Sequence, residues 1–202
     1  MNSRVTAQDL GEDFERNLED LLLNPIHYRG WLTKPYGINP GLSEGGAVGK
    51  KFMISGLDAS SEERCVFPDE NDQPLWAFDR SHIGHWRVMS REIIRYVPFA
   101  NTPVWAMSLS GRFADSLIEN EHVEETVLAV LMSAAKAAVF SAYHRKERIF
   151  FPRGLPEFVR NGFLYRCQHK GNYSQFSGSE EILHEGQIVW EATFHGSTLH
   201  SV

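Results

Sequence analysis

Six residues in the C-terminal part of the chain could together hold a small polar ligand: Arg153, Tyr165, Phe176, Glu181, Trp190 and His195. They lie on an extended connector and on three expected strands. A sheet that curls against a helix would bring several of them to one concave face. An inward carboxylate beside an arginine, with aromatic walls, suits recognition of a small polar molecule. The competing interpretation is an aromatic core with a salt bridge at its rim.

Catalysis by the same region would use His195 as a general base that Glu181 orients. This requires the two side chains to lie within hydrogen-bond reach and beside a cavity. The Pro-Cys-x-x-Cys signature of zinc deaminases is missing from the sequence. The sequence therefore favours a protein that is not an enzyme, with the His195 and Glu181 pair as the catalytic alternative.

No cofactor and no metal ion are expected. The segment Gly45–Lys51 lacks the spacing of a phosphate-binding loop, and Lys51 stands where a hydroxyl should meet magnesium. Nine histidines are present, but the pair His82 and His85 has no cysteine or glutamate partner at the spacing of a zinc site. Cys65 and Cys167 are too few and too far apart for a disulfide framework, so we expect reduced thiols.

Composition indicates an ordinary globular protein. Hydrophobic residues make up 42% and charged residues 23% of 202, and the net charge is −6. An acidic balance opposes a broad phosphate-binding surface, so direct nucleic-acid binding is not expected. The sequence has no apolar run of about 18 residues and no apparent signal peptide, which predicts a cytoplasmic protein without membrane association.

The N-terminal half alternates one helix with several strands. Thr6 or Asp9 is expected to cap a helix that runs to about Leu23, and a Gly- and Pro-rich connection follows to Lys51. The sequence does not indicate whether its Gly37–Lys50 part is ordered. Strands are expected at 52–57, 64–67, 74–78 and 104–109, and residues 89–96 fit either a helix or a strand.

The C-terminal half carries the clearest helix, from His122 to about His144. Strands follow at 163–169, at 173–176 resuming at 181–184, and at 187–195, and Glu185-Gly186 predicts a hairpin turn between the last two. Residues 103–111 and 188–196 resemble each other, which suggests halves at 1–111 and 112–202. We therefore predict a single α+β domain over 1–202, with a mainly antiparallel sheet packed against one long helix and possibly two similar halves.

Many scattered positions between about 103 and 199 resemble a bacterial family of uncharacterised domains. The matching positions are Pro103–Met107, Gly111-Arg112, Arg153-Gly154, Pro156, Asn161–Cys167, Gly171, Phe176–Gly178, Glu180–Ile182, Gly186, Val189 and Phe194–Gly196. Members of that family occur alone or behind an XRE-type helix-turn-helix in transcriptional regulators. The resemblance implies a compact α+β sensor or effector-binding module, although residues 1–50 show no helix-turn-helix of their own.

These observations favour a non-enzymatic module that binds a small molecule, of the sensor or effector type. The main alternative is a protein-interaction module, such as an inhibitor or adaptor, that acts through a sheet edge or an apolar patch. The second alternative is an enzyme that uses His195 and Glu181. The sequence does not indicate the oligomeric state.

Overall fold

The computed structural model describes residues 5–11, 13–23, 50–57, 60–68, 71, 73–84, 86–117, 121–145 and 148–200. The Gly- and Pro-rich connection, including the Gly37–Lys50 segment up to Gly49, lies outside the described residues. In the part of the chain that is described, no helix is long and apolar enough to cross a membrane.

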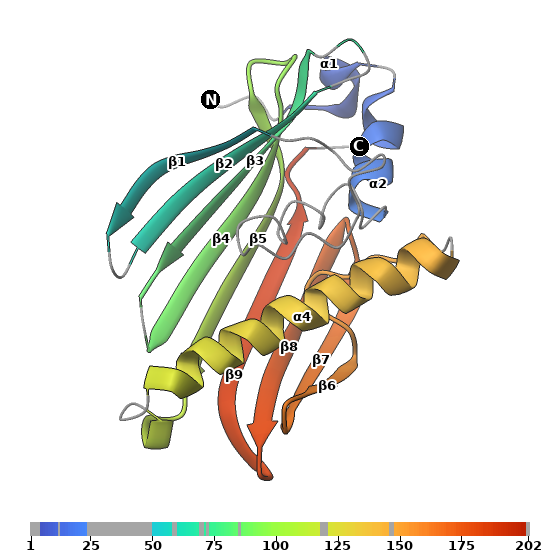
Figure 1. The fold of residues 1–202 in the computed structure, drawn as a ribbon. Coiled ribbons are helices and arrows are strands. Elements are labelled where there is room, and N and C mark those ends of the chain that lie inside the picture. Colours follow the sequence, from blue (N-terminus) through green and yellow to red (C-terminus); the bar gives the residue numbers. More distant parts are fainter. Residues whose placement is uncertain are drawn as a thin grey trace.

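The strands of the described residues form one antiparallel sheet in the order β1-β2-β3-β4-β5-β9-β8-β7-β6 (Figure 1). Its N-terminal part consists of β1 (Lys50–Leu57), β2 (Ser60–Pro68), β3 (Pro74–Ile83), β4 (Arg87–Tyr96) and β5 (Thr102–Phe113). Its C-terminal part consists of β6 (Glu157–Arg160), β7 (Phe163–Asn172), β8 (Gln175–His184) and β9 (Gln187–Thr198). The last strand, β9, pairs with β5 and joins the two parts.

The helices are α1 (Ala7–Leu10), α2 (Phe14–Leu23) and α4 (Glu121–Arg145), with a 3-10 turn η1 (Asp115–Leu117) before α4. Thr6 caps α1 through a capping box with Asp9, as the sequence indicated. The single helix expected up to Leu23 is instead divided at Gly11, whose φ of 103° is incompatible with helix. The helix expected at 122–144 is present as α4.

The predicted fold class is wrong. We expected an α+β fold with a mainly antiparallel sheet packed against one long helix and possibly two similar halves. The protein is instead mostly sheet, with about a quarter of the chain helical. The long helix α4 approaches mainly β6 and β7, and α1 and α2 also contribute buried residues to the core. The sheet is continuous through β5 and β9, and residue 111 lies inside β5 rather than between two halves.

The prediction failed because the strands are longer than their apolar segments. β5 extends to Phe113 and β7 to Asn172, beyond the ends at 109 and 169 that hydrophobicity suggested. The ambiguous segment 89–96 is part of strand β4. Polar residues at the strand ends pair through backbone hydrogen bonds, which do not depend on side-chain hydrophobicity.

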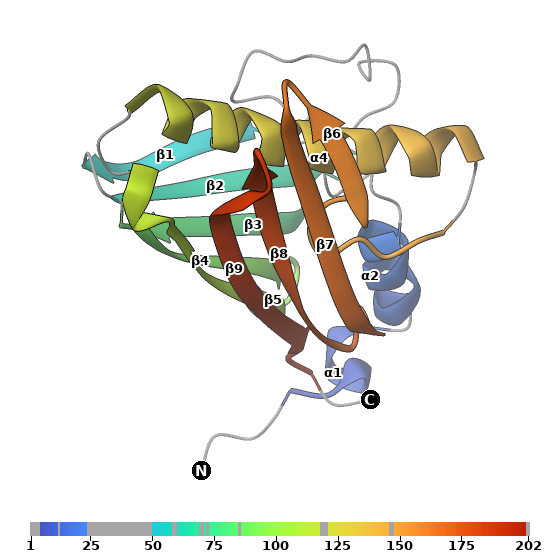
Figure 2. The same cartoon turned by 90° about the horizontal axis from the view of Figure 1, so that it is seen from below.

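The sheet is curved (Figure 2), and the burial of its side chains differs between its two faces. We call the face toward α4 the inner face and the opposite one the outer face. Trp105, Met107 and Leu109 of β5 are buried on the inner face, whereas Ser110 and Arg112 are exposed on the outer face. The same alternation holds in β8 and β9. Neighbouring residues of one strand therefore belong to different surfaces.

Aromatic side chains fill the inner face. Trp105 stacks on Phe176 with ring centroids 5.6 Å apart, and Phe113 contacts Trp190 at 4.8 Å. Gly111 leaves room for the indole of Trp190, because a Cβ built at Gly111 would lie 2.6 Å from that ring. The end of the sheet is closed by α2, where Phe14 packs edge-on against His200 at 4.9 Å.

The Glu185-Gly186 hairpin turn is confirmed. Both residues have positive φ, 52° and 78°, as a two-residue type I′ turn requires. Asn161-Gly162, with φ of 51° and 81°, makes the same kind of turn between β6 and β7. Turns of this kind therefore join β6 to β7 and β8 to β9.

The close contact at Gly111 generates a stability prediction. Gly111→Ala should lower the free energy of unfolding by about 1–3 kcal/mol, because the added methyl overlaps the buried ring of Trp190. Urea unfolding monitored by tryptophan fluorescence measures the change. Ser110→Ala, one residue away on the exposed outer face, should change stability by less than about 0.5 kcal/mol. Equal effects of the two substitutions would contradict the packing argument.

Candidate functional site

A buried carboxylate, Glu180, is the centre of a polar cluster on the inner face. The residue is 2% exposed. The guanidinium of Arg153 donates two hydrogen bonds to it, from Nε to Oε2 at 3.0 Å and from Nη2 to Oε1 at 2.9 Å. This two-point geometry is the strongest arrangement available to an arginine and a carboxylate. It fixes the connector before β6 to the middle of β8.

Two aromatic residues complete the coordination of Glu180. The hydroxyl of Tyr165 donates to Oε2 at 3.0 Å, and the indole Nε1 of Trp190 approaches Oε1 at 3.4 Å. The Tyr165 hydroxyl also accepts a hydrogen bond from the backbone N–H of Gly154 at 3.1 Å. Four donor groups therefore surround one carboxylate, so the buried charge is fully hydrogen-bonded.

Burial changes the acid–base properties of this cluster. Burial, together with the charge of Glu180, raises the pKa of Tyr165 well above its usual value of 10.0. The attraction of Glu180 and of Glu92 outweighs the burial of Arg153 and raises the pKa of its guanidinium. The side chains of Arg153 and Glu180 are 14% and 0% exposed. A cluster this closed has a structural role, because a ligand could reach Glu180 only by displacing its partners.

The structure brings together part of the predicted site. Arg153, Tyr165 and Trp190 meet on the inner face, but the carboxylate they share is Glu180 rather than Glu181. Phe176 lies on the same face, in the aromatic core beside Trp105. The remaining two predicted residues, Glu181 and His195, lie on the outer face, where they pair across strands with Glu191 and Ser177.

Glu181 and His195 do not form a catalytic pair. His195 lies opposite Ser177, four residues along β8 from Glu181, which corresponds to about 13 Å along the strand. Glu181 instead approaches Arg166, with 3.6 Å between Arg166 Nη1 and Glu181 Oε1. Hydrogen-bond reach, which a general base and its orienting acid need, is exceeded several-fold. Among the described residues, no three His, Cys, Asp or Glu side chains gather as ligands for a metal ion.

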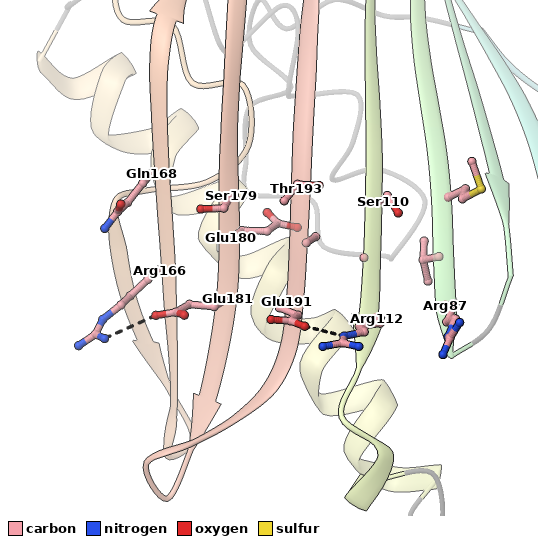
Figure 3. Close-up of a pocket in the computed structure, with 14 residues that line it drawn as sticks. Arg87, Ser110, Arg112, Arg166, Gln168, Ser179, Glu180, Glu181, Glu191 and Thr193 are labelled. Atoms are coloured by element: carbon pink, nitrogen blue, oxygen red, sulfur yellow. Dashed lines mark hydrogen bonds and ion pairs between the residues drawn. The ribbon is translucent and has the colours of Figure 1, made fainter.

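The outer face carries a groove of about 710 Å³ over β4, β5, β9, β8 and β7. We call it the outer groove. Figure 3 shows its polar side chains on the side of the sheet away from α4. The residues whose side chains face it are Arg87, Met89, Ser110, Arg112, Arg166, Gln168, Ser179, Glu181, Glu191 and Thr193.

Cross-strand pairing arranges these side chains in two parallel rows. The first row follows directly paired positions from β7 to β4: Arg166, Glu181, Glu191, Arg112 and Arg87. The second row lies two residues further along each strand: Gln168, Ser179, Thr193, Ser110 and Met89. One row is therefore charged and the other mostly hydroxyl and amide, which together offer hydrogen bonds to a polar ligand.

His195 belongs to a second hollow on the same face, of about 630 Å³. Lys170 and Ser177 also line it, and the three are paired across β7, β8 and β9. This hollow continues the outer groove along the strands. His195 is therefore an outer-face residue, separated from Arg153 and Trp190 by the thickness of the sheet.

Strand parity in the sequence could have identified Glu180 as the buried acid. Glu180 has the same strand parity as the buried Phe176 and Ile182, which places it on the inner face. Glu181 has the parity of Ser177 and Ser179, which places it outside. Arg112, at the end of β5, was missed because the expected strand stopped before it.

Fold and groove define an all-antiparallel, curved-sheet domain with a closed inner face and an open polar outer face. The chain belongs to a family of domains of unknown function, DUF5680, which matches residues 80–199. The match begins within β3, earlier than the resemblance near residue 103 suggested, and includes every residue of the outer groove. The expected membership in an uncharacterised family is confirmed. No curated protein and no solved structure matched the chain.

The buried cluster generates a prediction about stability. Glu180→Gln should lower the free energy of unfolding by about 3–5 kcal/mol, because it leaves the charge of Arg153 without its buried counter-charge. Chemical denaturation at neutral pH measures this loss. Glu191→Gln removes the carboxylate of an exposed ion pair with Arg112, so it should cost less than about 1 kcal/mol. Comparable losses in both variants would show that Glu180 is no more structural than a surface acid.

The raised pKa of Tyr165 predicts how stability depends on alkaline pH. The unfolded chain loses the tyrosine proton near pH 10, whereas the folded protein keeps it. The free energy of unfolding should therefore fall as pH rises above about 10. Burial raises the pKa of Cys167 in the same direction from its usual value of 9.0. Tyr165→Phe should reduce the slope of unfolding free energy against pH between about 10 and 11 without removing it. An unchanged slope in this variant would refute the assignment.

Proposed function

We propose that this protein is a non-enzymatic module that binds a small polar molecule in the outer groove. The observation that carries the proposal is the groove itself, about 710 Å³ with two rows of hydrogen-bonding side chains. Volumes of about 300–1,000 Å³ are typical of sites for small ligands. Hydroxyl and amide groups such as Ser179, Thr193 and Gln168 are exposed there and remain available to a ligand.

The inner face supports this proposal indirectly. The donors around Glu180 are already used within the protein, so the cluster has little left to offer a ligand. Exposed hydroxyl and amide groups such as Ser110, Ser179 and Gln168 lie on the outer face. The proposed ligand-binding residues accordingly include Glu181 from the sequence-based set, and His195 where a ligand extends into the neighbouring hollow. Arg153, Tyr165, Phe176 and Trp190 support the sheet behind it.

The sequence resemblance extends the proposal to the source of the protein, its cellular location and the kind of domain it is. On that ground we propose a bacterial, cytoplasmic sensor or effector-binding domain, of the kind that follows a helix-turn-helix in regulators. The acidic net charge of −6 supports recognition of a small molecule rather than of nucleic acid.

A second candidate, a protein-interaction module, is favoured by one observation. Ile83 and Met89 are directly paired across β3 and β4 and are 62% and 67% exposed, at the margin of the outer groove. Two large apolar side chains in contact with water are typical of a protein-binding surface. In this alternative, Ile83→Asp and Met89→Asp would release a co-purifying polypeptide.

Native mass spectrometry of the protein purified from its own host tests the proposal. We expect an added mass of one defined small molecule that denaturation releases. Thr193→Trp, which fills the centre of the groove from an exposed position, should abolish that mass. Val159→Trp is the matched control, since Val159 is 67% exposed on β6 outside the groove, and it should keep the bound molecule.

Two results would contradict small-molecule binding in the groove. One is a wild-type protein that carries no compound and retains none from a metabolite extract. The other is a compound that survives Thr193→Trp unchanged. A second polypeptide in the wild-type spectrum, lost on Met89→Asp, would instead support the interaction module.

A further inference from the structure

The outer groove contains an arginine pair whose charges are not balanced. Arg87 of β4 and Arg112 of β5 are directly opposite each other across the two strands. Side chains in such pairs have Cβ atoms about 4.5–5.5 Å apart, and like charges placed this way are destabilising. Figure 3 shows both guanidiniums on the same side of the sheet at one end of the groove.

Within the charged row, Arg112 has an acidic partner, whereas Arg87 does not. Arg112 Nε lies 2.5 Å from Oε1 of Glu191, and Arg166 Nη1 lies 3.6 Å from Oε1 of Glu181. The two acids of the row are thus matched to two of its three arginines. Within the described part of the chain, the side chain of Arg87 forms no ion pair and no hydrogen bond. The row carries one net positive charge, located at its β4 end.

We propose that Arg87 and Arg112 together bind an anionic group of the ligand, a carboxylate or a phosphate. This inference rests on the proposed function and names the chemical class of the molecule in the groove. A guanidinium presents a planar set of N–H donors that matches both kinds of oxyanion, and each contact is charge-assisted. An anion between the two arginines would remove their mutual repulsion.

The geometry of Arg112 is consistent with this role. Glu191 contacts it through Nε, and no described residue hydrogen-bonds to its terminal N–H groups, which are therefore available to a ligand at the groove. The hydroxyl of Ser110 lies in the neighbouring row and could meet the uncharged part of the same ligand. The ligand would then lie with its acidic end over β4 and β5 and its polar body over β9 and β8.

Titration of the full-length protein with two probes, inorganic phosphate and acetate, tests the inference by NMR of backbone and arginine Nε–H resonances. We expect saturable shifts around Arg87 and Arg112 with at least one probe. Tighter binding of phosphate indicates a phosphorylated ligand, and tighter binding of acetate indicates a carboxylic acid. Arg87→Gln should raise the dissociation constant of the tighter-binding probe about tenfold, because one charge-assisted contact is lost.

Arg91→Gln is the matched control. Arg91 is an exposed arginine on the same strand and the same face, but it lies outside the groove lining. Removing it deletes the same charge and should change the dissociation constant less than about twofold, the size expected for distant screened charges. Equal weakening by Arg87→Gln and Arg91→Gln, or shifts that do not saturate with either probe, would overturn the arginine-pair site.

Native mass spectrometry of Arg87→Gln separates this inference from the proposed function. If the variant keeps the co-purifying molecule at wild-type occupancy, the anion assignment is wrong and groove binding still stands. If phosphate or acetate saturates the arginine pair but the wild-type protein retains no compound, the anion site stands and the proposed function fails. Loss of the molecule in Arg87→Gln but not in Arg91→Gln supports both.

Discussion

The ion pair between Arg153 and Glu180 is the interaction on which the C-terminal half of the sheet depends. A carboxylate in the middle of a buried strand is tolerated only when its charge is compensated and its oxygens are hydrogen-bonded. Arg153 supplies the charge, and Tyr165 and Trp190 supply further donors. The indole that is held in this way lies against Gly111 of β5. The need to compensate the buried charge of Glu180 thus links side chains on β7, β8 and β9 and, through the indole of Trp190, the backbone of β5.

The buried cluster around Glu180 gives the inner face a structural role, whereas the exposed side chains of the outer face are available for binding. The inner face uses its polar groups within the protein and is closed by aromatic rings and helices. The outer face keeps its arginines, acids and hydroxyls in rows along paired positions, where solvent reaches them. A sheet whose inner surface is packed around Glu180 is a suitable base for a binding site, because the backbone that carries the outer side chains is held from behind.

The fold and the site were predictable to different degrees from the sequence. The long helix and the hairpin at Glu185-Gly186 have strong local signals, and both are present. The continuous sheet could not be predicted, since the pairing of β5 with β9 joins residues 77 to 93 positions apart and leaves no local pattern.

The site was only partly predictable for a related reason. Arginine, aromatic residues and an inward acid were expected together, and they do meet, but around the neighbouring acid Glu180. Strand parity decides which of two consecutive glutamates faces inward, and Phe176 and Ile182 indicate it for β8. The rows of the outer groove depend on which strands are neighbours, so they become visible only once the order of the strands is known.

The neighbouring acids Glu180 and Glu181 restrict the register in which β8 can pair with the adjacent strands. A slip of one residue would exchange the faces, so Glu181 would enter the aromatic core and Phe176 and Ile182 would turn to water. Arg153 would lose its partner, and Glu180 would face solvent. In β8 the shifted pairing is costly because it would bury Glu181 without a counter-charge and expose two apolar side chains. The exposed acid next to Glu180 therefore helps to exclude the nearest incorrect register.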